Sequence, residues 1–426
     1  MIKRPARSGR AAAATVIVGM TLLVSAGTAF ASSWTGYSRP VTSTLYSVAH
    51  AGLGRCVAVG DSGALLLTRD AGLTWAPQTD PDDTNANLFG AAFANVSRGI
   101  AVGENGTILR TTNGGTAWTV QPDPDVNAND LRAVAFPTTS RACAVGDDGT
   151  VLVSGNGGVR WTAEPTVTAN RLSAVSFVGA SHGWAVGDNG TILVTSNGGA
   201  HWSAQHDPDP DANNLRGVSF VDTTHGWAVG DGGTILVTSN GGAKWSLQID
   251  PDDQSSALRA VRFTDRKNGT AVGDGGTIIS TGDGGKNWSV KNDPDATGSD
   301  LLSIASADAN HGIAVSETGV VVRSGTNTRT RTTLGAPGQA KKGKSIGFSG
   351  KLTPAGAAGT VTVTAYVRGA HGTWLLVGTA STNASNGSFK TSYKPTKAGT
   401  WRFRATFSGS GWYSASSSAY ATVKVN

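Results

Sequence analysis

One segment determines the fold, because copies of it recur along the chain. It is Gly226-Trp227-Ala228-Val229-Gly230-Asp231-Gly232-Gly233-Thr234-Ile235-Leu236-Val237-Thr238-Ser239-Asn240-Gly241-Gly242-Ala243-Lys244-Trp245. Its tripeptide Ala-Val-Gly ends at six positions spaced 43, 43, 41, 43 and 43 residues apart, namely Gly60, Gly103, Gly146, Gly187, Gly230 and Gly273. A seventh copy, Ala314-Val315-Ser316, follows after another 43 residues. A period of this length indicates a repeat architecture, which is considered before local secondary structure.

Each repeat divides into four short strands. In the fifth repeat these are predicted over Leu215–Phe220, Gly226–Val229, Thr234–Thr238 and Trp245–Gln248, with a glycine turn at Asp231-Gly232-Gly233. Four strands in a period of about 40 to 50 residues are typical of a propeller blade. The seventh repeat lacks its tryptophan strand, whereas Trp34-Thr35 stands 11 residues before Leu45, as Trp161-Thr162 stands before Leu172. The sequence therefore predicts an all-β fold, a seven-bladed β-propeller over residues 32–332 that its N-terminal strand closes.

The turn before each tryptophan resembles the Asp-box, or bacterial neuraminidase repeat. The fuller pattern, from Gly226 to Trp245, resembles the propeller of photosystem II assembly and stability factors. This resemblance implies a fold and leaves the function open. The box residues are predicted to be structural, because Asp or Asn can hold the turn and Trp can pack on the blade. They are Asp70, Asn113, Asn156, Asn197, Asn240 and Asp283, with Trp75, Trp118, Trp161, Trp202, Trp245 and Trp288.

The two ends of the chain differ from its middle in charge. Residues 1–31 carry four Lys or Arg and no acid before and around an apolar run that ends near Ala29-Phe30-Ala31, which predicts a secretory signal peptide cleaved near Ala31. Residues 333–426 carry eleven Lys or Arg and no acid, while residues 32–332 carry 20 basic and 29 acidic residues. We therefore expect a secreted or cell-surface protein with an acidic body and a basic tail domain. No transmembrane segment is expected, because the apolar run is too short.

The repeat ends before a second predicted domain. Residues 333–344 read as a linker, and six alternating runs over 345–426 predict a β-sandwich. The pattern Lys397-Ala398-Gly399-Thr400-Trp401-Arg402-Phe403 resembles bacterial immunoglobulin-like modules, which implies an immunoglobulin-like fold. Residues 338–345 match the P-loop pattern, but a linker precedes them and a strand follows, so phosphate binding is rejected.

Two groups of residues raise the question of metals and thiols. Asp207-Pro208-Asp209-Pro210-Asp211 has the spacing of a calcium loop, but Ala212 and Val218 stand where an EF-hand needs Gly and Glu. The Asp-Pro-Asp segments are therefore predicted to be solvated connectors, and no metal or cofactor is expected. Cys56 and Cys143 fall on the second strands of blades one and three, so we expect two free, buried thiols.

Three arginines recur at the start of the first strand of blades three, five and six, near the channel mouth. Arg132, Arg216 and Arg259 each precede a turn acid by 15 residues, which favours cross-strand ion pairs over a ligand-binding cluster. Sialidase-type chemistry would need a Tyr nucleophile with a partner acid. The propeller offers only Tyr37 and Tyr46, and only three glutamates.

Two functions follow as hypotheses. The first is a non-enzymatic, monomeric propeller that binds a protein or an anionic extracellular polymer, with the sandwich as a spacer or envelope-binding module. The second is a carbohydrate-active enzyme, sialidase-like or another glycoside hydrolase, acting at the channel mouth. We expect the residues at the channel mouth to be similar from repeat to repeat, which favours the first hypothesis.

Each blade has one acid in the turn after its second strand, which predicts an acidic face. We expect this face to meet a cationic partner, with the tail domain as one candidate. Nucleic acid is not expected as a partner.

Overall fold

The computed structural model describes residues 34–52, 54–251, 256–308, 310–325, 330–353, 359–369, 371–384, 387–409 and 412–426. The predicted signal peptide over 1–31 lies outside these ranges. Within them, no helix is both long and apolar enough to cross a membrane.

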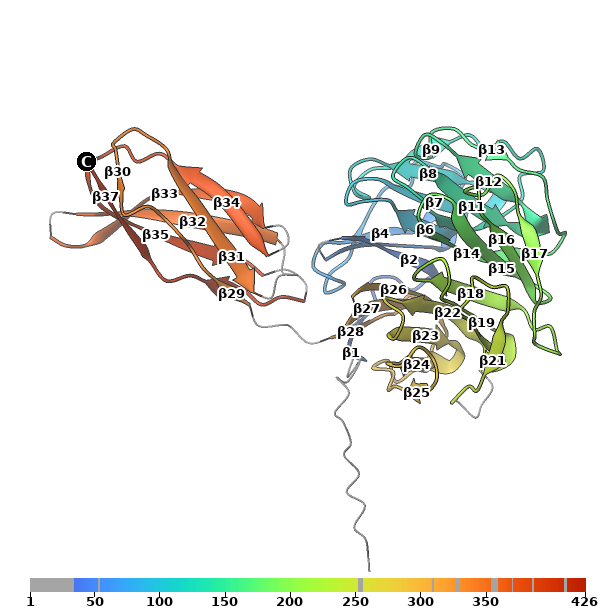
Figure 1. Cartoon of the computed structure of the whole chain (residues 1–426). Coiled ribbons are helices and arrows are strands. Elements are labelled where there is room, and N and C mark those ends of the chain that lie inside the picture. Colours follow the sequence, from blue (N-terminus) through green and yellow to red (C-terminus); the bar gives the residue numbers. More distant parts are fainter. Residues whose placement is uncertain are drawn as a thin grey trace, which may run out of the picture.

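Seven four-stranded antiparallel sheets make up the first domain (Figure 1). Blades one to three contain β2 (Leu45–Gly52) to β5 (Ala76–Pro77), β6 (Leu88–Phe93) to β9 (Thr119–Gln121), and β10 (Leu131–Ala135) to β13 (Thr162–Ala163). Blades four to six contain β14 (Leu172–Val178) to β17 (Ser203–Gln205), β18 (Leu215–Phe220) to β21 (Ser246–Gln248), and β22 (Leu258–Phe263) to β25 (Ser289–Val290). The intervening strands are β3 (Arg55–Gly60), β4 (Leu65–Thr68), β7 (Gly99–Gly103), β8 (Ile108–Thr111), β11 (Ala142–Gly146), β12 (Val151–Ser154), β15 (His182–Gly187), β16 (Thr191–Thr195), β19 (Gly226–Gly230), β20 (Ile235–Thr238), β23 (Gly269–Gly273) and β24 (Ile278–Thr281).

The seventh blade joins the two ends of the domain, as predicted. It contains β26 (Leu301–Asp308), β27 (His311–Ser316), β28 (Val321–Ser324) and the N-terminal strand β1 (Trp34–Ser38). β1 runs antiparallel to β28, with Trp34 opposite Ser324 and Ser38 opposite Val321. The first strands of all blades neighbour one another around the ring, and β26 lies beside β2. The ring is therefore closed by pairing between distant parts of the chain.

The box turns are held by their own side chains. In blade five, Asn240 Oδ1 accepts hydrogen bonds from the Lys244 amide at 2.9 Å and the Thr238 hydroxyl at 3.0 Å. The corresponding residue of every other box accepts the same amide bond, at 2.9 or 3.0 Å. The box tryptophans of blades two to five are buried, and those of blades one and six are half-buried. These residues hold the blade together rather than facing a ligand.

Aromatic stacks join neighbouring blades. Trp184 of blade four lies 3.5 Å from Phe220 of blade five between ring centroids, and Trp227 stacks on Phe263 of blade six at the same distance. Cys56 and Cys143 are both free and buried, as predicted. Burial raises the pKa of each thiol, which keeps it protonated and unreactive.

The second domain is a β-sandwich. One sheet contains β29 (Arg331–Thr332), β31 (Ile346–Thr353) and β34 (Ser388–Tyr393). The other contains β30 (Gln339–Ala340), β37 (Ala421–Val425), β35 (Gly399–Phe407), β32 (Gly359–Arg368) and β33 (Trp374–Ala384), with β36 (Ser416–Ser417) beside β35. Trp401, Phe403 and Phe389 lie in the core between them. Assignment of this sandwich to the immunoglobulin-like class stays a prediction.

The sandwich starts earlier than the sequence analysis placed it. β29 pairs with β31, and β30 pairs in parallel with β37, so both edges recruit residues before 345. Leu334, Ala336 and Ala340 also pack against the sandwich core. The predicted linker over 333–344 is therefore part of the domain. Its few apolar residues pack against the sandwich core, but the Gly and Lys residues around them give the segment the composition of a linker.

One tryptophan of the sandwich packs into the propeller. Trp412 is 4% exposed and shares a buried cluster with residues of blades one and seven. Its indole N–H donates to the Ser324 carbonyl at 3.1 Å, and its ring lies 4.9 Å from that of His311 and 6.4 Å from that of His50. Both histidines lie by the turn after the first strand, on the face opposite the acidic turns. The expectation that the tail domain meets the acidic face is therefore wrong, because aromatic packing rather than charge joins the domains.

Candidate functional site

The channel mouth is lined by one side chain from each blade. The residue after the first leucine of each inner strand faces the same cavity of about 180 Å³, and the seven are Tyr46, Phe89, Arg132, Ser173, Arg216, Arg259 and Leu302. We call these seven residues the mouth ring. Every member differs in character from at least one neighbour, although the surrounding repeat is nearly constant. The expected sameness of the mouth is therefore wrong, because the strongest repeat signal comes from buried positions.

The three arginines of the mouth ring form the predicted cross-strand ion pairs. Arg132 donates through Nε and Nη2 to the two oxygens of Asp147 at 2.8 and 2.6 Å. Arg216 and Asp231 repeat this fork at 2.9 and 2.7 Å, and Arg259 and Asp274 at 2.6 and 2.8 Å. Each guanidinium is thereby fixed in position, since two parallel bonds set both its place and its plane.

The third nitrogen of each guanidinium is less engaged. Nη1 of Arg216 lies 3.3 Å from Asp188, and Nη1 of Arg259 lies 3.9 Å from Asp231. Nη1 of Arg132 has no hydrogen-bond partner among the described residues. Burial would raise the pKa of Asp231, but hydrogen bonds from Arg216 and Asn214 outweigh it and hold that pKa below its ordinary value. Asp231 therefore stays ionised and holds Arg216 in place, while Nη1 of Arg132 remains available.

The other side of the mouth ring is apolar. Leu302, Tyr46 and Phe89 come from the consecutive blades seven, one and two. Tyr46 packs edge-to-face on Phe89 at 5.1 Å, and the Arg132 guanidinium lies 4.4 Å above the Phe89 ring. Burial, followed by a hydrogen bond to Asp61, raises the pKa of Tyr46 to about 12. The phenol is therefore a poor nucleophile at neutral pH.

The Asp-Pro-Asp connectors are less solvated than predicted. Asp209 is 8% exposed and accepts hydrogen bonds from the Thr234 hydroxyl at 3.0 Å and the Asn213 amide at 3.2 Å. Asp295 is also buried. The connectors therefore fasten the turn after the second strand. Within the described ranges, no group of three or more His, Cys, Asp or Glu is arranged to hold a metal ion.

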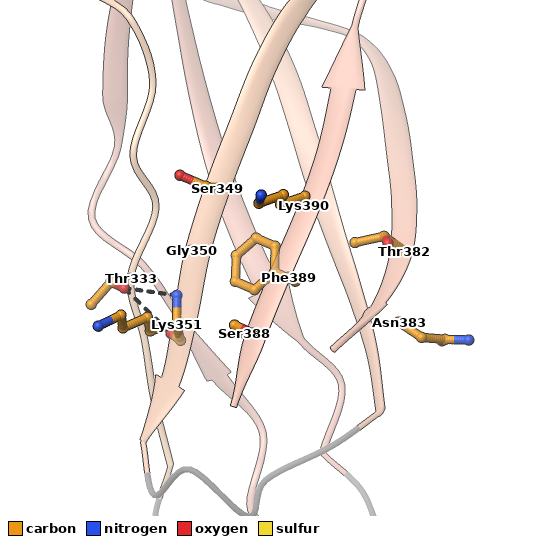
Figure 2. A pocket seen from close by; sticks show the side chains of 9 residues that line it. All are labelled: Thr333, Ser349, Gly350, Lys351, Thr382, Asn383, Ser388, Phe389 and Lys390. Carbon is orange, nitrogen blue, oxygen red and sulfur yellow. Dashed lines mark hydrogen bonds between the residues drawn. The ribbon is translucent and has the colours of Figure 1, made fainter. Parts of the chain in front are cut away.

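A second hollow lies on the sandwich, between β31, β33 and β34 (Figure 2). Its floor is the buried ring of Phe389, which lies beside Gly350. Figure 2 shows Lys351 and Asn383 pointing away on opposite sides, so the polar groups do not converge. The hydrogen bonds drawn in Figure 2 join Thr333 and Lys351 at the edge of the domain. The polar side chains that line this hollow are therefore not arranged around one ligand position.

Comparisons with known proteins agree with this fold. The family model described as "Photosynthesis system II assembly factor YCF48" matches residues 15–112 and 158–254. A solved structure of YCF48 bound to D1 peptide is 21% identical, with a TM-score of 0.58, and covers 68% of this chain and 96% of its own. YCF48 from Cyanidioschyzon merolae is 20% identical, with a TM-score of 0.58 over 68% of this chain and 99% of its own.

A glycoside hydrolase has a related fold. The GH74 enzyme of Niastella koreensis is 13% identical, with a TM-score of 0.55, and covers 91% of this chain and 80% of its own. No curated protein matches the chain. Fold and matches together define a β-propeller built from bacterial neuraminidase repeats. Within that class, this chain is similar to the photosystem II assembly factor YCF48.

Proposed function

We propose that this chain is an exported, non-enzymatic propeller that binds a segment of another protein at its mouth ring. The sandwich serves as a spacer or an envelope-binding module. The observation that carries the proposal is the division of the mouth ring into an apolar side and a cationic side whose arginines are already fixed. Preorganised donors beside aromatic anchors are typical of recognition sites.

The mouth ring suits an extended peptide that carries an apolar side chain beside a carboxylate. The apolar group would pack on Tyr46 and Phe89, and the carboxylate would accept from the free Nη1 of Arg132. The solved YCF48 structure with a D1 peptide supports a peptide as the ligand class. An acidic polymer would use the same Nη1 edges without needing the apolar side.

The alternative, a carbohydrate-active enzyme, finds less support at the mouth. A glycosidase general acid needs a raised pKa, whereas Asp231 has a lowered one. The pKa of Tyr46, raised to about 12, keeps its phenol protonated at neutral pH and makes it a poor nucleophile. The likeness to the GH74 enzyme concerns the fold alone.

The test uses residues 32–426 as bait in an extract of the cell envelope. The test variant is the double change Phe89→Ser, Arg132→Ser. Blade four already has serine, Ser173, at the equivalent position of the mouth ring, so we expect the variant to fold. We expect the wild-type chain to retain a partner protein that the double variant loses. The control is Lys244→Ser, an exposed box-turn change on the opposite face.

Retention of the same partners by the double variant would contradict the proposal. Glycan hydrolysis by the wild-type chain that is lost in an Asp231→Asn variant would favour the enzyme instead. Raising salt to physiological strength should weaken retention, because exposed charges are screened beyond about 8 Å.

A further inference from the structure

Blade six departs from the repeat at one lumen position. The fifth residue of the first strand is small in six blades, namely Ala49, Ala92, Ala135, Ser176, Ser219 and Ala305. Blade six has Arg262 instead. A guanidinium has therefore replaced a methyl group or a hydroxyl inside the channel.

Arg262 lies in a cavity deeper in the channel than the mouth ring. The cavity measures about 200 Å³ and is lined on its polar side by Arg262, His50 and Ser306. Val48, Ala49 and Ile304 form apolar walls. The two cavities have different linings, so the deeper one is separate from the mouth ring.

The charge on Arg262 is not balanced by any described residue. Each mouth-ring arginine has an aspartate partner, but no ion pair or hydrogen bond joins Arg262 to another described side chain. The Arg262 side chain is exposed to the lumen of the channel. The surrounding channel wall partly desolvates the guanidinium and so lowers its pKa. An unpaired guanidinium that lines the channel is available to an anion that enters from solution.

The neighbouring blades add two further departures from the repeat. His50 and Ser306 stand where the other five blades have Phe93, Phe136, Phe177, Phe220 and Phe263. Nδ1 of His50 accepts the Gly52 amide at 3.1 Å, which assigns the ring proton to Nε2 in the neutral form. Blades six, seven and one, which are adjacent, thus place a cation, a hydroxyl and an imidazole around one cavity.

We propose that the Arg262 cavity binds a small monocarboxylate with a short apolar chain. One guanidinium balances one negative charge, and its planar fork matches a carboxylate. The alanine, valine and isoleucine walls suit a hydrocarbon tail and disfavour a doubly charged oxyanion. The volume equals that of about six or seven liquid waters, which limits the tail to a few carbons.

The experiment follows the melting temperature of the 32–426 chain with butyrate, at constant ionic strength. We expect a rise that saturates with butyrate concentration and none with butyramide, the neutral isostere. Arg262→Ala gives blade six the residue of four other blades and should lower butyrate affinity at least tenfold. Arg266→Ala, an exposed arginine of the same blade paired with Asp222, is the matched control and should leave the response unchanged.

Three outcomes would overturn the proposal: an equal response to butyramide, an equal response to phosphate, or a butyrate response that survives Arg262→Ala. The variant should itself fold, because alanine already stands at this position in four other blades. If the variant fails to fold, a crystal soaked with butyrate decides the question by density at Arg262. Neither result bears on the mouth ring.

Discussion

Gly106 shows why the turn after the second strand of a blade ends in glycine. Its φ is +71°, in the left-handed region, and the carboxylate of Asp123 lies where a Cβ would stand. The same arrangement recurs at Gly63 with Asp80, and at Gly276 with Asp293. Glycine is therefore required at this position for two reasons. Its backbone is left-handed, and the connector packs where a side chain would lie.

Gly106→Ala should lower the free energy of unfolding of the propeller by about 1–3 kcal/mol, because the left-handed conformation and the displaced carboxylate both cost energy. The measurement is a urea titration followed by tryptophan fluorescence. Gly155→Ala is the control, since a Cβ at Gly155 would meet nothing within 4 Å. Equal midpoints for the two variants would show that the turn is not constrained.

Asp70 should make stability depend on pH. Burial would raise its pKa, but hydrogen bonds from the hydroxyl and amide of Thr74 and from Thr68 hold the pKa below its ordinary value. A depressed folded-state pKa gives stability that is present above the unfolded value of about 3.9 and is lost as pH falls through the folded value. Urea midpoints should therefore fall less between pH 5 and pH 3 in Asp70→Asn than in the wild type. An equal fall in Asp70→Asn and in the wild type would contradict this prediction.

At the scale of the blade, the sequence predicted most of the fold. The strands of blade five lie within one residue of their predicted bounds, because buried alternating runs and glycine turns repeat in register. The repeat pattern could not predict the positions at which the residue differs from one blade to the next. The mouth ring was missed as a set, since only its arginines carried a visible signal, although listing the residue after each first leucine would have revealed it. Arg262 was missed for the same reason.

The predictions for the Asp-Pro-Asp connectors and for the linker over 333–344 were wrong for a different reason. Asp209 and Gln339–Ala340 lie in segments whose composition is typical of solvated loops. Their tertiary partners, the Thr234 hydroxyl and strand β37, determine whether they are buried. Composition describes the chain alone, whereas burial depends on what the rest of the fold brings against it.

Strand β1 should be essential to the ring. Trp34 is 5% exposed and packs in a core cluster between blades six and seven, while Tyr37 in the same strand is 62% exposed. Trp34→Ala should cost about 3–5 kcal/mol, as expected for a buried Trp, and Tyr37→Ala much less. Equilibrium unfolding of both variants measures the difference. A Trp34→Ala loss no greater than that of Tyr37→Ala would mean that the ring does not depend on its closing strand.

At the scale of the whole molecule, the two domains meet through aromatic contacts on the propeller face opposite the mouth ring. This arrangement leaves the mouth ring and its acidic surround uncovered by Trp412. The sandwich can therefore act as a spacer or an envelope-binding module without blocking a ligand at the mouth. The acidic face stays a prediction, and the domain contact leaves it uncovered because Trp412 packs on the opposite face.

Trp412→Ala should separate the domains. The change removes the indole hydrogen bond to Ser324 and the ring contacts with His311 and His50, and it leaves an apolar slot between blades one and seven. We expect a larger radius of gyration by small-angle X-ray scattering and a lower melting temperature of the propeller, since a buried Trp is worth about 3–5 kcal/mol. Leu375→Ala, at a 54% exposed position of the same sandwich, is the control and should change neither quantity. An unchanged radius of gyration in Trp412→Ala would mean that other contacts hold the domains together, and an unchanged melting temperature would mean that the slot closes without cost.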